Sequence, residues 1–134
     1  METKKVLVVD DEMDMRLFLT TLLKISGFLP VTARDGTEGM KKLDEEENLP
    51  GLIILDVMMP GEGGVIMYRR LKTEEKFAEI PVIIHSGVKK KAFLHYLKMI
   101  NAFKEKESFE PYAYIEKPAE PEKLIESIRS AFKK

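Results

Sequence analysis

The sequence Gly51-Leu52-Ile53-Ile54-Leu55-Asp56 places a carboxylate directly after an apolar run of strand length. The run has no polar alternation and lies between Pro50-Gly51 and Pro60-Gly61, a pattern typical of an interior strand of a parallel sheet. Asp56 then lies at the carboxyl end of that strand, where open α/β sheets place their ligands. A buried carboxylate is costly unless its charge is used or neutralised, so the functional interpretation depends on the partners of Asp56.

Short apolar runs alternate with amphipathic segments on both sides of this strand. Further strands are predicted at 6–9, 29–33, 80–84 and 112–115, and helices over about 13–25, 35–46, 64–75, 89–106 and 121–132. We expect Gly27 to end the first helix and Asp35 with Glu38 to form a capping box for the second. The alternation predicts right-handed crossovers and a parallel sheet covered on both faces, that is, a doubly wound three-layer α/β sandwich of five strands and five helices.

Composition and charge narrow the class of protein. The 134 residues are 44% hydrophobic and 34% charged, which predicts one globular domain over residues 1–134. The net charge of -1 gives no basic field that would indicate direct nucleic-acid binding. No apolar stretch reaches membrane-spanning length, and the N-terminus lacks the layout of a signal peptide. With no cysteine, the chain is compatible with the reducing cytoplasm, where we expect it to act.

Polar residues gather where the predicted strands end. Asp10-Asp11, Asp56, Ser86 and Lys117 all follow apolar runs and would meet at one edge of the sheet. Three carboxylates brought together repel one another, so they need a proton or a cation, and a hard divalent ion such as Mg²⁺ (or Mn²⁺) suits them. A lysine and a hydroxyl opposite the acids suit phosphoryl oxygens. The set therefore predicts a phosphoryl site in which one carboxylate is the nucleophile and the other two hold the metal.

The ordered motifs resemble a known family. Asp10-Asp11, Asp56 with Met59-Pro60 and Gly64, Ser86-Gly87, and Tyr114-Ile115-Glu116-Lys117-Pro118 are similar in order and approximate spacing to the receiver domain of bacterial two-component response regulators. Each motif alone is weak, but together they span the chain from Lys4 to the final helix. The resemblance implies a flavodoxin/CheY-like fold with strand order 2-1-3-4-5.

The resemblance also implies roles at the phosphoryl site. Asp56 would accept a phosphoryl group from a phosphohistidine on a sensor histidine kinase or phosphotransfer protein. Asp11 would ligate Mg²⁺ directly, Asp10 mainly through water, and the backbone carbonyl of Met58 would complete the protein's ligands. Lys117 would pair with Asp56 before transfer and with a phosphoryl oxygen afterwards.

The same resemblance implies a conformational switch. Ser86 would move toward the phosphoryl group, and Tyr114 would turn inward. The signal would pass to an output protein through the surface made by the fourth helix, fifth strand and fifth helix, with the chain a monomer or a phosphorylation-dependent dimer. Such a domain signals rather than acting as an enzyme, although it promotes its own phosphotransfer and autodephosphorylation.

Two features depart from the commonest receiver pattern. Gly87 follows Ser86 where the family often has alanine, which would loosen the switch loop. The interval from Ser86 to Lys117 is also longer than we expect, and the surplus falls in an enlarged segment at about 89–111. Its start, Lys89-Lys90-Lys91, is a solvated face or a site for an acidic partner. His85 and His95 have no metal-ligand spacing, so we interpret both as structural or surface residues.

Other classes of protein remain as alternatives. A phosphatase-type hydrolase of the haloacid dehalogenase kind needs a second acid two residues after the nucleophile, where this chain has Met58. A degenerate receiver that serves only as a docking module is disfavoured because all the acids and the lysine are present. Asp10-Asp11-Glu12 alone would be read as a helix cap, and Lys117 alone as a solvated lysine.

Overall fold

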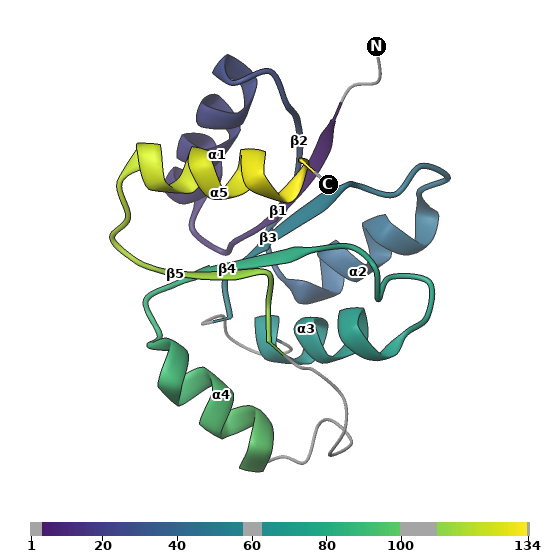
Figure 1. Ribbon diagram of the computed structural model, residues 1–134. Helices are drawn as coiled ribbons and strands as arrows, with labels where there is room; N and C mark the ends of the chain where they lie inside the picture. The colour runs from purple at the N-terminus through teal and green to yellow at the C-terminus, as the bar shows by residue number, and fades with distance from the viewer. Residues whose placement is uncertain (1–3, 58–62, 100–109, 134) are drawn as a thin grey trace.

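A five-stranded parallel sheet organises the computed structural model, which describes residues 4–57, 63–99 and 110–133 (Figure 1). In chain order the elements are β1 (Lys5–Val9), α1 (Met13–Ile25), β2 (Leu29–Ala33), α2 (Gly36–Glu45), β3 (Leu52–Leu55), α3 (Gly64–Thr73), β4 (Val82–Ser86), α4 (Lys90–Met99), β5 (Ala113–Glu116) and α5 (Pro121–Ala131). The strands lie in the order β2-β1-β3-β4-β5, and every neighbouring pair is parallel. The predicted three-layer α/β sandwich and its strand order are confirmed.

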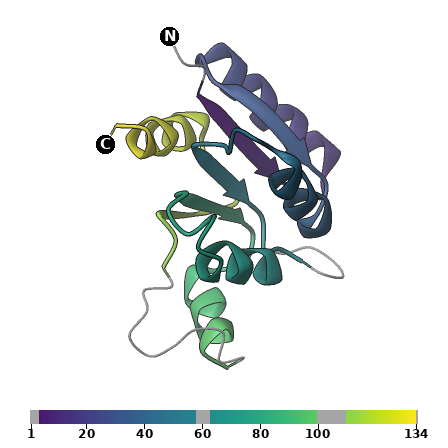
Figure 2. The ribbon, with the colours of Figure 1, turned by 90° about the vertical axis from the view of Figure 1, so that its right-hand side faces the viewer.

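The helices cover the two faces of the sheet unequally. Helices α1 and α5 lie on one face, and α2, α3 and α4 lie on the other (Figures 1 and 2). Because successive side chains of a strand point to opposite faces, each inner strand contributes to two cores. In β3, Leu52 and Ile54 pack toward α1 and α5, whereas Ile53 and Leu55 pack toward α2 and α3. None of the described helices is long and apolar enough to cross a membrane.

The predicted helix caps are present. Gly27 has a φ of 90° after α1, where the Phe28 N–H donates to the Leu23 carbonyl and the Gly27 N–H to that of Lys24. This pair of bonds is a Schellman motif, which favours glycine because its backbone is left-handed. At the start of α2 the Glu38 N–H donates to Asp35 Oδ1 at 2.8 Å, and the Glu38 side chain reaches back to the Arg34 N–H.

Two predicted strands are shifted along the chain. The fourth strand was predicted at 80–84, but β4 begins at Val82 and continues to Ser86. Pro81 has no N–H to donate, so the ladder uses only its carbonyl, which accepts from the Ile53 N–H, while the Lys117 N–H pairs with the Ser86 carbonyl at the other end. The fifth strand, predicted at 112–115, is Ala113–Glu116, because Glu116 pairs with Ser86 at the end of β4. His85 and Ser86 therefore belong to the sheet.

The segment before β5 is described only in part. Helix α4 begins at Lys90 and its described residues end at Met99. The remainder of the helix predicted to about 106, and most of the enlarged segment at 89–111, lie outside the described residues. The organisation of residues 1–134 as one domain with an enlargement there stays a prediction.

Candidate functional site

The sheet places two carboxylates side by side at its carboxyl edge. Val9 is paired with Leu55, and the Asp56 N–H donates to the Val9 carbonyl at 3.0 Å, so Asp10 and Asp56 follow adjacent strands at the same level. Asp10 is 1% exposed and Asp56 is 4% exposed. Both acids are thus removed from bulk water by the packing of the strands that carry them, and their charges need local partners.

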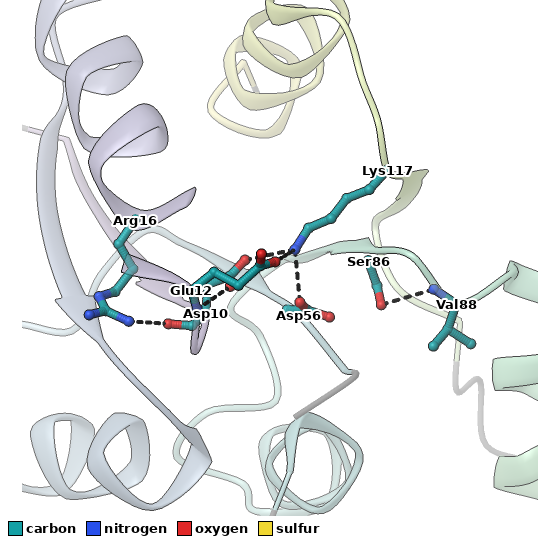
Figure 3. Close-up of polar contacts among 7 residues, drawn as sticks. All are labelled: Asp10, Glu12, Arg16, Asp56, Ser86, Val88 and Lys117. Atoms are coloured by element: carbon teal, nitrogen blue, oxygen red, sulfur yellow. Dashed lines mark hydrogen bonds and ion pairs between the residues drawn. The ribbon is translucent and has the colours of Figure 1, made fainter. Parts of the chain in front are cut away.

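The turn after β1 brings two more acids to the same place. The Glu12 N–H donates to Asp10 Oδ1 at 3.0 Å, and the Arg16 guanidinium of α1 donates to the Asp10 carbonyl at 2.7 Å, which fixes the turn (Figure 3). As a result, Asp10, Asp11, Glu12 and Asp56 each offer a carboxylate oxygen, and these oxygens all lie within 4.8 Å of one another. Asp11 and Glu12 are exposed, so the cluster is open to solvent on one side.

Lys117 supplies the positive charge among these acids. Its Nζ lies 2.9 Å from Asp56 Oδ2, 3.0 Å from Asp10 Oδ2 and 3.3 Å from Glu12 Oε1 (Figure 3). The residue follows β5 directly, its N–H donates to the Ser86 carbonyl, and its peptide bond to Pro118 is cis. The three donors of the ammonium group are therefore all directed at carboxylates.

The pKa values follow from burial and from these contacts. Burial is the largest influence on Asp10 and raises its pKa, although the Glu12 N–H and Lys117 act in the opposite sense. Burial also acts to lower the pKa of Lys117, but the hydrogen bonds and charges of Asp56 and Asp10 outweigh it, and the pKa lies well above its ordinary value. Lys117 is therefore charged at neutral pH.

The donor set fits a hard divalent cation. Four carboxylates converge, and Lys117 pairs with three of them, those of Asp10, Glu12 and Asp56. Carboxylate oxygens are the ligands that Mg²⁺ prefers, and a site open on one side leaves room for water and phosphate oxygens. The side chains present can therefore hold such an ion. Met58, whose backbone carbonyl we predicted as a further ligand, lies outside the described residues.

Ser86 and Tyr114 both bind the backbone of one residue, Val88. The Ser86 hydroxyl is buried and accepts from the Val88 N–H at 3.2 Å, while the Tyr114 hydroxyl donates to the Val88 carbonyl at 2.6 Å. The Tyr114 ring lies 5.6 Å from that of Phe93 in α4, and burial raises its pKa to about 12. The loop between β4 and α4 is thus held by the two residues that we predicted as a switch.

Glu116 connects the end of β5 to the start of α4. Its carboxylate accepts from the Lys90 N–H and from Lys89 Nζ, both at 3.4 Å. A carboxylate at the first N–H groups of a helix is favourable because these groups lack partners within the helix. The residue before Lys117 therefore ties the acidic site to α4.

The structure brings together Asp10, Asp11, Asp56 and Lys117 as the sequence predicted, with Ser86 on the neighbouring strand. The sequence did not predict three contacts. These are the hydrogen bond from Arg16 to the Asp10 carbonyl, the ion pair of Glu12 with Lys117, and the Val88 backbone as a shared partner of Ser86 and Tyr114. The acid run at 10–12 was a usable signal for Glu12. The other two contacts depend on backbone carbonyls, which the sequence does not mark.

These observations define an α/β domain with a cluster of acidic side chains at the carboxyl edge of a parallel sheet. The chain belongs to the response regulator receiver domain family, whose sequence profile matches residues 6–129. It is similar to the phosphate regulon transcriptional regulatory protein PhoB of Escherichia coli, with 31% identity over 137 aligned positions that cover 98% of this chain and 52% of PhoB. A homologue of the transcriptional regulatory protein CpxR in Haemophilus influenzae is 39% identical over 80 residues, or 60% of this chain and 33% of that protein. The chain spans about half the length of PhoB, the relative it matches along nearly all of its residues.

Solved structures support the fold. A response regulator receiver domain protein from Clostridium thermocellum has a TM-score of 0.74 and 28% identity, over 95% of this chain and 92% of that one. The chemotaxis response regulator CheY4 of Vibrio cholerae has a TM-score of 0.79 and 22% identity, over 98% of this chain and all of that one. The CheY-like architecture implied by the sequence motifs is therefore confirmed.

Proposed function

We propose that this domain is a phosphorylation-dependent signalling switch in which Asp56 accepts the phosphoryl group. The observation that carries the proposal is the Lys117 ammonium, which lies 2.9 Å from Asp56 and 3.0 Å from Asp10 while both carboxylates are buried. A lysine held in this position matches a site at which further negative charge arrives during phosphoryl transfer.

In the proposed reaction a carboxylate oxygen of Asp56 attacks the phosphorus of a phosphohistidine on a sensor histidine kinase or phosphotransfer protein. The P–O bond forms as the P–N bond breaks, and the leaving imidazole keeps the electron pair and takes up a proton. Lys117 moves its pairing from Asp56 to a phosphoryl oxygen, and the Ser86 hydroxyl donates to another. Lys117 already lies 2.9 Å from Asp56, and Ser86 ends the neighbouring strand β4, so both movements are local.

Asp10, Asp11 and Asp56 would hold Mg²⁺ or Mn²⁺, together with the Met58 carbonyl. Bound there, the ion supplies positive charge that offsets the repulsion between these carboxylates and the incoming phosphoryl oxygens. Glu12 lies within the same group of oxygens but also pairs with Lys117. We therefore assign Glu12 to the lysine rather than to the metal.

Ser86 and Tyr114 would carry the change to the surface. When the Ser86 hydroxyl turns to the phosphoryl group, the Val88 N–H loses its acceptor, and the loop before α4 is then held by Tyr114 and Glu116. We propose that this release alters the face of α4, β5 and α5. Beryllofluoride with Mg²⁺ should shift the NMR signals of α4 in the wild type, and Lys117→Ala should bind Mg²⁺ but lose that response.

Two surfaces suit the proposed partners. Exposed Met13 and Leu17, on the first turns of α1 beside Glu12, offer apolar area to a phosphodonor protein. The output protein would bind α4, β5 and α5, and a basic hollow there suits acidic side chains; it is lined by Lys89, Lys91, Ala92, Leu94, His95 and Lys98. We propose that the domain acts in the cytoplasm, as a monomer or a phosphorylation-dependent dimer, without direct contact to nucleic acid or membrane.

The test is phosphorylation by a small donor. Incubation with acetyl phosphate and Mg²⁺ should add one phosphoryl group, detected by intact mass, and Asp56→Asn should abolish the addition. Asp14→Asn, an exposed acid on α1, is the matched control and should be labelled like the wild type. Persistent labelling of Asp56→Asn would overturn the assignment of Asp56. A wild type that is never labelled would favour the docking module instead.

A further inference from the structure

His85 lies in the same row of the sheet as the two buried acids. Leu55 pairs with both Val9 and Ile84, so the next residues, Asp10, Asp56 and His85, form one row across β1, β3 and β4. Val8, Ile54 and Ile83, two positions earlier in these strands, all pack in the core under α1 and α5. Because side chains alternate along a strand, Asp10, Asp56 and His85 share that face, with neighbouring strands about 5 Å apart.

Lys117 has to pass over His85 to reach the acids. It follows β5, whereas Asp56 follows β3 and Asp10 follows β1, and β4 lies between β5 and β3. Lys117 is two positions after Ile115, which packs in the same core as Ile83 and pairs with His85. The lysine stem therefore crosses the end of β4 on the face that His85 occupies.

The His85 imidazole carries a buried nitrogen that has no hydrogen-bond partner. The residue is 2% exposed, and its Nδ1 is the buried side-chain atom of the described residues that lacks a partner. Burial is the largest cause that lowers the pKa of His85, to about 4, and the charge of Lys117 acts in the same direction. The carboxylates of Asp56 and Glu12 act to raise it. The ring is thus neutral at pH 7 and has one nitrogen free to accept a hydrogen bond. A leucine would fill this position without the cost of burying an unpaired polar atom.

Lys117 lacks acceptors in one state of the site. As described, its three donors go to Asp10, Glu12 and Asp56. When Asp10 and Asp56 engage a cation, fewer of their oxygens face the ammonium, yet the lysine side chain is only 14% exposed. A free donor in such a place needs a nearby acceptor.

We propose that His85 is a positioning residue for Lys117. The imidazole supports the lysine stem, and its unpaired nitrogen accepts a hydrogen bond from the ammonium group when the acids are engaged elsewhere. This bond keeps Nζ over Asp56 as the acids change partners. The inference rests on the proposed function in so far as Lys117 serves the phosphoryl group. It assigns a use to a histidine that the sequence indicated only as structural or surface.

The test compares variants that keep or remove the acceptor. His85→Leu and His85→Met fill the site without a strong acceptor, and His85→Asn retains one near the position of Nδ1. With acetyl phosphate at saturating Mg²⁺, we expect the two apolar variants to be phosphorylated about fivefold more slowly than the wild type, and His85→Asn to be slowed by about twofold or less. Isothermal titration should show unchanged Mg²⁺ affinity in all three, because no ligand is altered. The proposal is wrong if the apolar variants keep the wild-type rate, or if His85→Asn is as slow as they are.

A second readout does not depend on phosphorylation. NMR of ¹⁵N-lysine in the presence of Mg²⁺ should show the Lys117 ammonium hydrogens protected from solvent exchange in the wild type and in His85→Asn, and exchanging rapidly in His85→Leu. Equal exchange in all three proteins would overturn the positioning role. If the wild type takes up no phosphoryl group, the proposed function fails, while this measurement still decides whether His85 positions Lys117.

Discussion

The ends of β3 and β4 lie beside each other at the carboxyl edge of the sheet, but different interactions hold them. At the acid side, defined here as Asp10, Asp56, Lys117 and Gly64, buried charges are paired at 2.9 and 3.0 Å and α3 packs directly on the strand end. At the switch side, Ser86, Gly87, Val88 and Tyr114, two neutral hydrogen bonds hold an open loop. Paired buried charges and close backbone packing hold the acid side, whereas neutral hydrogen bonds, which cost less to exchange, hold the switch side.

Two glycines give the largest expected difference between these sides. A Cβ on Gly64 would lie 2.1 Å from the Asp56 carbonyl oxygen and 2.7 Å from the Val57 Cα, and neither backbone atom can move without shifting Asp56. Gly64→Ala should lower the free energy of unfolding by about 3 kcal/mol or more. Gly87→Ala meets nothing within 4 Å and should change it by less than about 0.5 kcal/mol.

Urea unfolding of both variants measures this contrast. Acetyl phosphate labelling of the same proteins shows whether Asp56 has moved. A Gly64→Ala protein as stable as Gly87→Ala would mean that the start of α3 does not rest on the end of β3.

The pH dependence of stability tests the buried histidine. His85 has a pKa of about 4 in the folded protein and 6.5 in the unfolded chain, so it carries no protonation penalty above pH 6.5, and the fold loses stability as the pH falls toward 4 because the unfolded chain takes up the proton first. The loss should approach about 3 kcal/mol, and His85→Leu should not show it. Asp10 acts in the opposite sense, because its raised pKa favours the protonated folded form, but it is present in both proteins.

The measurement is urea unfolding of the two proteins between pH 4 and 7 without metal. Lys117, Asp56 and Glu12 are the charged groups that act on His85, and they too are common to both proteins. The difference between the two curves therefore belongs to His85. Parallel curves would show that the imidazole is not buried beside the lysine.

The acid side was more predictable than the switch side, for physical reasons. The apolar run Leu52 to Leu55 has strand length and lies between Pro-Gly pairs, which indicates a buried strand, and the acid directly after it then lies at the sheet edge, so local pattern was sufficient. At the switch side the apolar run from Ile80 to Ile84 placed the strand two residues too early. Ile80 is buried outside the strand, and polar His85 and Ser86 continue it, because pairing with β5 rather than hydrophobicity sets its end.

The burial of His85 could not be predicted from the sequence. It depends on which face of β4 the ring occupies and on the path of Lys117, which comes from 32 residues further along the chain (117 minus 85). The role of Val88 is hidden for a related reason, since its contribution is a backbone N–H and carbonyl that any residue could provide. Pattern identifies side chains at strand ends, but it does not show which backbone groups these side chains bind.

Removing the lysine tests how the acid side tolerates its charges. Lys117→Met leaves Asp10 and Asp56 buried without their cation, and we expect a loss of about 2 kcal/mol in EDTA at pH 7, less than for a fully buried pair because solvent reaches one side. Mg²⁺ should restore most of this stability, since it supplies the missing charge to the same oxygens. Urea unfolding with EDTA or with Mg²⁺ checks both points. Lys91→Met, which alters an exposed lysine of α4, is the control. Equal stability of Lys117→Met and wild type in EDTA would contradict the ion pairing.

The smallest expected effect lies at the switch side, where Tyr114→Phe removes one hydroxyl. The Val88 carbonyl loses the donor that lies at 2.6 Å, while the ring keeps its contact with Phe93, so the free energy of unfolding should fall by about 1 kcal/mol. Tyr112→Phe is the matched control: its hydroxyl bonds Ser130 at an exposed position where water can replace it, so its unfolding should be nearly unchanged. Labelling of Asp56 by acetyl phosphate should be retained in both variants, because neither hydroxyl touches the acids, but the response of α4 to beryllofluoride should weaken in Tyr114→Phe alone. If α4 responds to beryllofluoride in both variants as it does in the wild type, the Val88 loop is held by Ser86 and Glu116 without the tyrosine hydroxyl. The aromatic side chain is then packing rather than part of the switch.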